Sequence, residues 1–369
     1  MTHTSSHIKR VIIAGGGTGG HIFPALAIAR ALQRLQPDTE ILFVGAKGKM
    51  EMEKVPQAGY AIQGLDIAGM DRGNKLKNIS LPIKLVKSLI QARNILNAFR
   101  PDLALGVGGY ASFPVLYMAQ RRGIATMIQE QNSQAGKANQ FLGRRARKIC
   151  VAYEHMEKFF PANRIIVTGN PVREELSRQL PDKKAARVSL GLDPDRKTLF
   201  AFGGSLGALS INQAIAKHLD ALLSEGIQVL WQTGKSFIGQ ATSLKHDKGP
   251  RVQVHAFIQD MAAAYAAADI VVCRSGALTI AELCIVGKPV IFVPYPYASE
   301  DHQTKNALAL VQHDAALMVR NADVDTDLIP KCLNLINDET MKEILTENIR
   351  KFGIPDADIR IAREIISCR

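Results

Sequence analysis

The sequence predicts an α/β protein built from two Rossmann-like domains, each with a parallel sheet. Short apolar, β-rich runs alternate with segments of helical pattern along the chain, which is typical of parallel sheets with crossover helices. A strand, a glycine turn and a helix open the chain at 11–32, and the same device returns at 198–215. The length of 369 residues suits about two domains better than one core.

The expected strands fall into two sets, separated by a Gly-Asn-Pro turn within "VTGNPVREEL" (167–176) and by the charged segment 182–196. Those of the first half are 10–15, 40–45, 103–109, 125–130 and 148–153. Those of the second half are 198–202, 227–234, 252–257, 269–274 and 288–294.

Composition narrows the class of protein and of partner. The formal net charge of +12 suits an anionic partner such as nucleic acid, a membrane surface or a phosphorylated substrate, or serves solubility alone. No apolar run reaches the ~18 residues of a transmembrane helix, and the first ten residues lack a signal-peptide core, so a cytoplasmic protein is expected. The five scattered cysteines indicate reduced thiols.

The first glycine turn matches G-x-G-x-x-G through Gly15, Gly17 and Gly20. A dinucleotide site also needs an acidic residue after the second strand, where this chain continues through Gly45 to lysines. A Walker A loop is excluded, because no Gly-Lys-Ser/Thr follows the turn. We therefore expect an anion-binding turn with unhindered N–H groups before a helix. His21 at its mouth can act as a general base, or it only caps or packs under the loop.

The second half carries a comparable set of loops. "FGGSLGALS" (202–210) offers another anion turn, and "RSGALTIAEL" (274–283) enters a helix that carries Glu282. A carboxylate there can accept from both hydroxyls of a ribose, although a solvated glutamate is the more common case. In "DHQTKNA", His302 and Gln303 either bind sugar hydroxyls or simply begin a helix.

The segment 75–100 combines basic residues with apolar positions at helical spacing. Residues 85, 89, 92, 96 and 99 form the apolar stripe, and Lys84 and Lys87 lie off it. Two interpretations carry equal weight: a surface that docks on anionic lipid, or a core helix with a solvated basic face.

Seven motifs in order resemble the MurG family, the bacterial N-acetylglucosaminyltransferases that make lipid II for peptidoglycan. They are "GGGTGGHIFPALAIA", "GVGGYASFP", "IQEQN", "TGNPVR", "GGSLGA", "AFIQDMAAAYAAADIVVCRSGALTIAEL" and "DHQTKNA". The resemblance runs from about residue 10 to about residue 365, nearly the whole chain. It departs at Leu206, where a polar residue is common, and in the loop "YASEDHQ".

The resemblance implies a GT-B fold, two Rossmann-like domains facing across a cleft. It implies an acceptor and membrane domain at 1–168, a UDP-GlcNAc domain at 169–352 and a C-terminal helix at 353–369 that packs back on the first domain. The implied reaction moves GlcNAc with inversion to the C4 hydroxyl of undecaprenyl-diphospho-muramoylpentapeptide (lipid I). The resemblance implies an enzyme bound peripherally to the cytoplasmic face of the bacterial membrane. It also implies association with other proteins of cell-wall synthesis and division.

The resemblance also implies roles for individual residues. His21 matches the candidate base, and Glu130 and Tyr110 lie in segments associated with the acceptor side, with Glu130 the next candidate base. The residues matching UDP-GlcNAc contacts are Thr18, Gly19, Gly20, Asn132, Arg173, Ser205, Ile258, Ala277, Leu278, Thr279, Ile280, Ala281, Glu282 and Gln303. The backbone of Ile258 is expected to read uracil.

No cofactor or protein-bound metal is expected to be required. The three D-x-D triplets, at 193–195, 323–325 and 356–358, do not follow convincing strand ends and are interpreted as turns and helix caps. Two other functions remain: a GT-B transferase with a different lipid or small-molecule acceptor, and a nucleic-acid-binding protein. The last would need aromatic stacking platforms, which aromatic residues at 6% do not supply.

Overall fold

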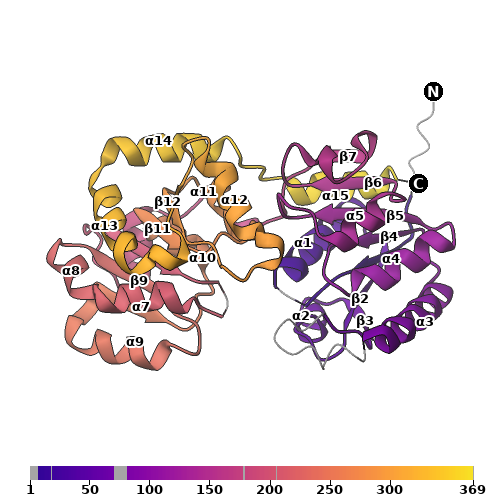
Figure 1. Ribbon diagram of the computed structural model, residues 1–369, viewed down its shortest axis with the longest axis horizontal. Helices are drawn as coiled ribbons and strands as arrows, with labels where there is room; N and C mark the ends of the chain where they lie inside the picture. The colour runs from indigo at the N-terminus through magenta and orange to yellow at the C-terminus, as the bar shows by residue number, and fades with distance from the viewer. Residues whose placement is uncertain (1–6, 18, 70–80, 178, 205, 369) are drawn as a thin grey trace. The chain divides into compact units, whose positions relative to one another are not determined.

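The computed structural model describes residues 7–17, 19–69, 81–177, 179–204 and 206–368, and the chain divides into two compact units. The first unit comprises Met1–Val172 together with Asp356–Arg369, and the second comprises Arg173–Pro355. The boundary between residues 172 and 173 falls inside the expected join at 167–176. Each unit is a separate α/β domain with its own sheet (Figure 1).

The first unit is built on a seven-stranded parallel sheet in the order β3-β2-β1-β4-β5-β6-β7. Side chains of β1 alternate between two apolar clusters, Val11 and Ile13 on one face and Ile12 and Ala14 on the other, as expected for a sheet covered on both sides. The strands are β1 (Arg10–Ala14), β2 (Glu40–Ala46), β3 (Ala61–Leu65), β4 (Leu103–Gly106), β5 (Ala125–Glu130), β6 (Lys148–Val151) and β7 (Ile165–Val167). The helices are α1 (Gly19–Leu35), α2 (Glu51–Gln57), α3 (Leu81–Phe99), α4 (Ser112–Arg121), α5 (Lys137–Gly143) and α15 (Ala357–Ile366).

The second unit has a six-stranded parallel sheet in the order β10-β9-β8-β11-β12-β13. Its strands are β8 (Thr198–Phe202), β9 (Gln228–Gln232), β10 (Val252–His255), β11 (Ile270–Cys273), β12 (Val290–Phe292) and β13 (Leu317–Met318). Its helices are α6 (Lys183–Ser189), α7 (Leu209–Lys217), α8 (Leu219–Ser224), α9 (Ile238–Lys245), α10 (Met261–Ala267), α11 (Ala277–Val286), α12 (His302–Val311), α13 (Val324–Asn337) and α14 (Glu339–Arg350). Short 3₁₀ turns lie at Met156–Lys158, Ala162–Arg164, Glu174–Leu176, His246–Arg251, Ser299–Asp301 and Asn321–Asp323.

The α/β class with two parallel sheets is confirmed, and three strands were not expected from the sequence. These are β3, β7 and β13, and each is an outermost strand of its sheet. The sequence of β3 carries Gln63 and Gly64, whereas β7 (IIV) and β13 (LM) are apolar but only three and two residues long, too short to show the continuous run of a buried parallel strand.

The C-terminal helix α15 belongs to the first unit. Its residues Ile361, Ala362 and Ile365 are buried in the same apolar cluster as β1 and α1. Arg34 of α1 donates to Asp358 over 2.8 Å, and Lys148 of β6 donates to Glu364 over 2.6 Å. In Figure 1 the yellow helix α15 accordingly lies among the purple elements of the N-terminal half.

Helix α3 buries one face and exposes apolar residues on another. Ala92, Ile95 and Leu96 face the core, so part of the expected stripe is a core face. Leu85, at the start of the helix, is 37% exposed, so the stripe is not a core face along its whole length. The most exposed apolar residues of α3 lie off the expected stripe: Ile83 is 74% exposed, and Val86 and Ile90 are each 57% exposed. Residues 75–80 of the expected segment lie outside the described residues.

Candidate active site

Each sheet has one point where the strand order reverses, and the predicted site residues gather at these two points. In the first unit the reversal lies between β1 and β4, and in the second between β8 and β11. Ligands of open parallel sheets bind outside the carboxyl ends of the strands at such switch points. The first holds the glycine turn 15–17 and the loop 107–111, and the second holds the glycines Gly203, Gly204 and Gly207 and the loop 274–276.

At the first switch point, His21 on the first turn of α1 lies against the loop that follows β4. The Cβ position of Gly108 lies 3.0 Å from Cε1 of His21 and 3.5 Å from Oε1 of Gln131. Gly109 has a φ of +77°, and a Cβ there would lie 2.2 Å from the carbonyl oxygen of Gly16. Only glycine permits this conformation and this approach, so the two loops hold the imidazole at the end of the sheet.

Tyr110 lies against the same glycine turn. The Cβ position of Gly17 lies 3.1 Å from Cε1 of its ring. Burial, and then the charge of Glu51, raise the pKa of the Tyr110 hydroxyl, so this hydroxyl remains a protonated donor at neutral pH. The structure therefore brings His21 and Tyr110 to one turn. Gly19 and Gly20 begin α1 beside them, and Thr18 lies outside the described residues.

An internal carboxylate occupies the glycine turn. Glu51, the first residue of α2, is 1% exposed. The backbone N–H of Gly17 donates to both of its oxygens at 3.1 Å, and the N–H of Ala46 donates to Oε1 at 3.0 Å. The expectation of unhindered N–H groups in this turn is therefore wrong for Gly17, whose anion is the chain's own glutamate. The sequence did not reveal Glu51, because the dinucleotide pattern places the acid at the end of the strand itself.

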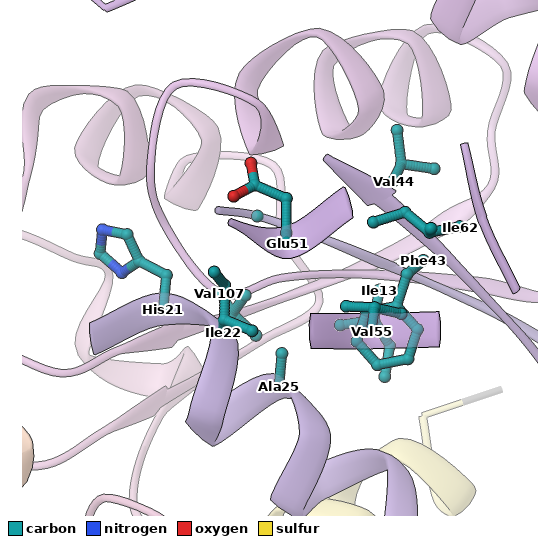
Figure 2. A pocket seen from close by; sticks show the side chains of 11 residues that line it. Ile13, His21, Ile22, Ala25, Phe43, Val44, Glu51, Val55, Ile62 and Val107 are labelled. Atoms are coloured by element: carbon teal, nitrogen blue, oxygen red, sulfur yellow. The ribbon is translucent and has the colours of Figure 1, made fainter. Parts of the chain in front are cut away.

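Figure 2 shows how Glu51 is placed beside a small cavity under the turn. Aliphatic side chains and Phe43 line the cavity, while the ring of His21 and the carboxylate of Glu51 extend away from them. Its volume is about 10 Å³, at the lower limit for one water molecule. The cavity is too small to hold a substrate. His21 and Glu51 line it on the side of the glycine turn.

Replacing Glu51 by glutamine should destabilise the first unit. An amide in this place would set an NH₂ group against backbone donors that now bind a carboxylate, at a cost of about 1–3 kcal/mol. Urea unfolding of the full chain measures the loss. The matched control is Glu53→Gln on the same helix, whose side chain is 68% exposed and whose effect should stay within about 0.5 kcal/mol. Equal losses for both variants would contradict the role given to Glu51.

Glu130 is buried at the end of β5 and is surrounded by donors. Oε1 accepts from the backbone N–H of Asn132 at 3.1 Å and from its side-chain amide at 3.3 Å. Oε2 accepts from Asn139 at 2.8 Å and from the N–H of Gly136 at 3.2 Å. Burial raises the pKa of Glu130, and these donors partly offset that rise. The carboxylate thus anchors the loop 131–136 and fixes Asn132 at the end of the strand.

A network of buried amides lies behind that loop. The side chain of Gln131 donates to the carbonyl of Val107 at 2.7 Å and to Gln129, which in turn donates to Asn170 at 3.0 Å. Asn170 donates back to the carbonyl of Gln131 at 2.9 Å. These glutamines were missed in the sequence. Their signal was the run of four polar residues that ends the strand in "MIQEQN".

In the second unit, Gln232 at the end of β9 connects two loops of the switch point. Its Nε2 donates to the carbonyl of Gly204 at 3.0 Å, and its Oε1 accepts from the N–H of Ile258 at 2.8 Å. The N–H of Ile258 is therefore engaged within the protein, and its carbonyl is the backbone group that can read a ligand. Gly207 has a φ of +82° and lies so close to Thr233 that a Cβ would clash. Ser205 lies outside the described residues.

Helix α11 presents its N-terminus at the same end of the sheet. Gly276 precedes it in extended conformation and no side chain caps it. Since the first N–H groups of a helix have no intrahelical acceptor, the half-buried residues Ala277, Leu278 and Thr279 form a ready anion site. Ile280 is buried and its N–H donates to Gly276 at 3.0 Å, and Ala281 follows within the helix.

Gln303 on α12 has a fixed orientation. Its side-chain oxygen accepts from the N–H of Tyr295 at 2.9 Å, and its carbonyl accepts from the hydroxyl of the buried Ser275 at 2.8 Å. The hydrogen bond to Oε1 fixes the amide group, whose nitrogen is a donor that suits a hydroxyl group. His302 is the first residue of the same helix.

Glu282 on α11 is buried, and an arginine and a tyrosine hold its carboxylate. The guanidinium of Arg173 lies 3.2 Å from Oε1, and the hydroxyl of Tyr265 donates to Oε2 at 2.9 Å. Burial raises the pKa of Glu282, whereas Arg173 and the Tyr265 hydroxyl lower it. The acidic group expected beside the α11 loop is therefore held by Arg173 and Tyr265. The contact with Tyr265 was missed in the sequence.

The D-x-D triplets occupy turns and helix starts. Asp193 accepts from the N–H of Asp195 at 2.9 Å, and Asp323 and Asp356 precede α13 and α15. Within the described ranges, no cluster of three or more His, Cys, Asp or Glu side chains has the arrangement of a metal site. Over the same residues, no helix has both the length and the apolarity to cross a bilayer.

Comparison with protein families assigns both halves of the chain. Residues 11–151 match the glycosyltransferase family 28 N-terminal domain, and residues 198–360 match the glycosyltransferase family 28 C-terminal domain. The chain belongs to glycosyltransferase family 28. The switch point of His21 lies in the first of these matches, and the switch point of Glu282 lies in the second.

Family 28 relatives match over nearly the full length. A Bacteroides fragilis protein named UDP-N-acetylglucosamine--N-acetylmuramyl-(pentapeptide) pyrophosphoryl-undecaprenol N-acetylglucosamine transferase is 53% identical over 361 residues, 97% of this chain and 95% of the relative. A protein of the same name from Parabacteroides distasonis is 50% identical over 358 residues, 97% of each chain.

Solved structures agree with the family 28 fold. The crystal structure of Acinetobacter baumannii MurG is 29% identical, with a TM-score of 0.77 over 97% of this chain and 99% of that one. UDP-glucose: anthocyanidin 3-O-glucosyltransferase in complex with UDP shares the fold, with a TM-score of 0.73 at 13% identity over 99% of this chain and 100% of that one. The GT-B class and the resemblance to the MurG family are thus confirmed.

Proposed function

We propose that this chain transfers GlcNAc from UDP-GlcNAc to the C4 hydroxyl of undecaprenyl-diphospho-muramoylpentapeptide, with inversion, and forms lipid II. The observation that carries the proposal is 53% identity over 361 residues to a relative named for this transfer. Its test is release of UDP from UDP-GlcNAc, which should require a muramoylpentapeptide lipid. Release that depends on a different acceptor would favour another GT-B transferase.

The proposal gives the two units different substrates. The acceptor and membrane domain corresponds to 1–168 and the donor domain to 169–352, with 353–369 returning to the first domain. Support for the division comes from the chemistry of the two switch points, since one carries an imidazole and a tyrosine and the other a helix N-terminus and a buried carboxylate.

On the acceptor side, His21 serves as the general base. Inverting transfer is a single displacement in which the acceptor hydroxyl loses its proton as it attacks the anomeric carbon. The imidazole sits at the carboxyl end of the first sheet, and Tyr110 lies on the same turn as a donor for the acceptor. Glu130 remains the second candidate base, although its four N–H donors favour a role in holding the loop with Asn132.

On the donor side, the second switch point supplies groups for each part of the nucleotide sugar. The N-terminus of α11 stabilises the charge that develops on the leaving diphosphate, and Arg173 adds a cation close to it. Glu282 accepts from the ribose hydroxyls, the carbonyl of Ile258 accepts from the N3–H of uracil, and Nε2 of Gln303 donates to a sugar hydroxyl. Thr18, Gly19, Gly20 and Ser205 complete the proposed contacts from the two glycine turns. This set neutralises the leaving group with backbone and side-chain donors, so the proposal includes no protein-bound metal or other cofactor.

The lipid-linked acceptor requires a visit to the membrane, and we place the enzyme peripherally on the cytoplasmic face. The docking surface is the exposed apolar row Ile83, Val86 and Ile90 of α3, with Lys84 exposed beside it. Lys87 is a less suitable probe than Lys84, because it lies 2.9 Å from Asp66 in an ion pair. Association with other proteins of cell-wall synthesis and division remains part of the proposal, and nucleic acid does not.

Replacing Ile83 and Val86 by asparagine should release the protein from anionic vesicles. Each apolar side chain contributes up to about 1.5–3 kcal/mol when it leaves water, so the partition coefficient should fall at least ~10-fold in sedimentation with vesicles. Activity on a short-chain, water-soluble acceptor should survive, and activity on the natural lipid in vesicles should fall.

The matched control is Val188→Asn in the second unit, because Val188 is 62% exposed and should leave vesicle binding unchanged. Unchanged binding of the Ile83/Val86 variant would show that α3 is not the docking surface. A parallel loss of activity on both acceptors would show that the row supports the fold instead.

A further inference from the structure

Buried Glu282 has acceptor capacity on both carboxylate oxygens that a cis-diol can use. An ionised carboxylate offers about four lone-pair sites, two on each oxygen. The hydroxyl of Tyr265 uses one site on Oε2 at 2.9 Å, whereas Arg173 lies 3.2 Å from Oε1 as an ion pair. Among the described residues no other hydrogen-bond donor to this carboxylate is found. At least one acceptor site therefore remains on each oxygen, which is the arrangement that two adjacent hydroxyls need.

The two partners of Glu282 differ in how far their side chains can move. The side chain of Arg173 is 33% exposed and lies on a loop that precedes a 3₁₀ turn, so it can shift toward a ligand. Tyr265 is 0% exposed on α10, with its ring packed edge-on against Phe200 and Phe202 at centroid distances of 5.9 and 6.2 Å. Its hydroxyl is consequently a fixed donor that sets the plane of the carboxylate.

We propose that Tyr265 is a positioning residue for ribose recognition: its hydroxyl holds Glu282 so that each carboxylate oxygen presents one acceptor site to the 2′ and 3′ hydroxyls of the nucleotide. The inference rests on the proposed function, in which Glu282 accepts from the ribose. Without the hydroxyl the carboxylate keeps its burial and its contact with Arg173, but it can rotate about its last torsion and lose the geometry for the diol.

The test compares UDP with 2′,3′-dideoxy-UDP by isothermal titration calorimetry. For the unmodified protein UDP should bind more tightly, and the ratio of the two affinities measures recognition of the hydroxyls. Tyr265→Phe removes one oxygen and keeps the ring. It should weaken UDP about 2- to 10-fold, the effect of one hydrogen bond, and leave the dideoxy nucleotide unchanged, so the ratio falls.

Two further variants separate the possible failures. Glu282→Gln should also lower the ratio; if it does not, the ribose role of Glu282 fails, and the inference about Tyr265 fails with it. If Glu282→Gln lowers the ratio and Tyr265→Phe does not, the proposed function stands and only the inference is overturned. Phe200→Leu disturbs the packing of the Tyr265 ring without touching its hydroxyl, so it should keep the ratio of the unmodified protein. A Tyr265→Phe variant that weakens both nucleotides equally would show a role in packing alone and would overturn the inference.

The pH dependence of UDP binding gives a second readout that packing alone would not move. Burial raises the pKa of Glu282, whereas Arg173 and Tyr265 lower it, and Glu175 raises it further. The buried Cys273 also interacts with this carboxylate, and burial keeps the thiol protonated. Loss of the Tyr265 hydroxyl should therefore raise the pKa of Glu282, and UDP affinity should begin to fall at a higher pH on acidification. If UDP affinity of the unmodified protein and of the Tyr265→Phe variant begins to fall at the same acidic pH, the inference is contradicted.

Discussion

Replacing His21 by alanine should lower turnover about 10²- to 10⁴-fold, the contribution of a positioned general base. The imidazole lies at the switch point of the first sheet, with its Cε1 3.0 Å from the Cβ position of Gly108. Affinity for UDP should stay nearly unchanged, because none of the proposed contacts to uracil, ribose or diphosphate involves the imidazole of His21. Steady-state kinetics with a water-soluble acceptor, together with UDP titration, measures both quantities.

Two other results would each give His21 a different role. Turnover near that of the unmodified enzyme would move the base elsewhere, and Glu130→Gln would then be the variant expected to lose turnover. A loss confined to donor affinity would make His21 a binding residue. The control is His155→Ala, because His155 is exposed in the first unit and has no place in the proposed site.

Replacing Glu282 by alanine should weaken UDP-GlcNAc binding by about 1.5–3 kcal/mol, the range for a hydrogen bond to a charged group. The alanine variant also leaves Arg173 and the buried Tyr265 hydroxyl without their acceptor, so its stability should fall as well. Glu282→Gln keeps the shape and isolates the effect of the charge. Titration with UDP measures the loss of affinity, and an alanine variant with unchanged affinity would refute the assignment.

The pH dependence of this contact has a definite sign. Burial raises the pKa of Glu282 above the value of a free carboxyl, so the buried, ionised group costs stability at neutral pH. This cost is absent below the unfolded pKa and grows as pH rises through the interval up to the folded pKa. UDP binding has the opposite requirement, because only the ionised form accepts from both hydroxyls, so affinity should fall as pH drops through the folded pKa.

The fold followed from the sequence because its signals are local. Buried strands such as β1 and β8 are continuous apolar runs that end at glycine turns, and helices follow each turn. The edge strand β3 escaped because its sequence, AIQGL, carries Gln63 and Gly64 and its residues are mostly half-exposed. Its place depends on pairing with β2, which no local pattern reveals.

The site was less visible, since its supporting contacts join residues that are distant in sequence or placed off the expected pattern. Glu51 lies outside the strand end where a dinucleotide motif would show its acid, and it reaches back from the start of α2. Tyr265 stands in the run "MAAAYAAAD", which reads as a plain core helix. Its one signal was the hydroxyl itself, because a buried tyrosine usually finds a hydrogen-bond partner.

Helix α3 shows a third limit. Its apolar residues lie on more than one face, so periodicity alone could not separate the core residues Ala92 and Leu96 from the exposed Ile83 and Val86. Packing against α4 decides which face is buried, and this packing depends on contacts between separate elements.

The most direct test of the central claim is the structure of the product formed from UDP-GlcNAc and a synthetic undecaprenyl-diphospho-muramoylpentapeptide. NMR of the purified product should show a single added GlcNAc in β configuration on C4 of the muramoyl sugar, with one UDP released per transfer. The His21→Ala variant should form it far more slowly. An α linkage, attachment at another hydroxyl, or hydrolysis to free GlcNAc without transfer would contradict the account.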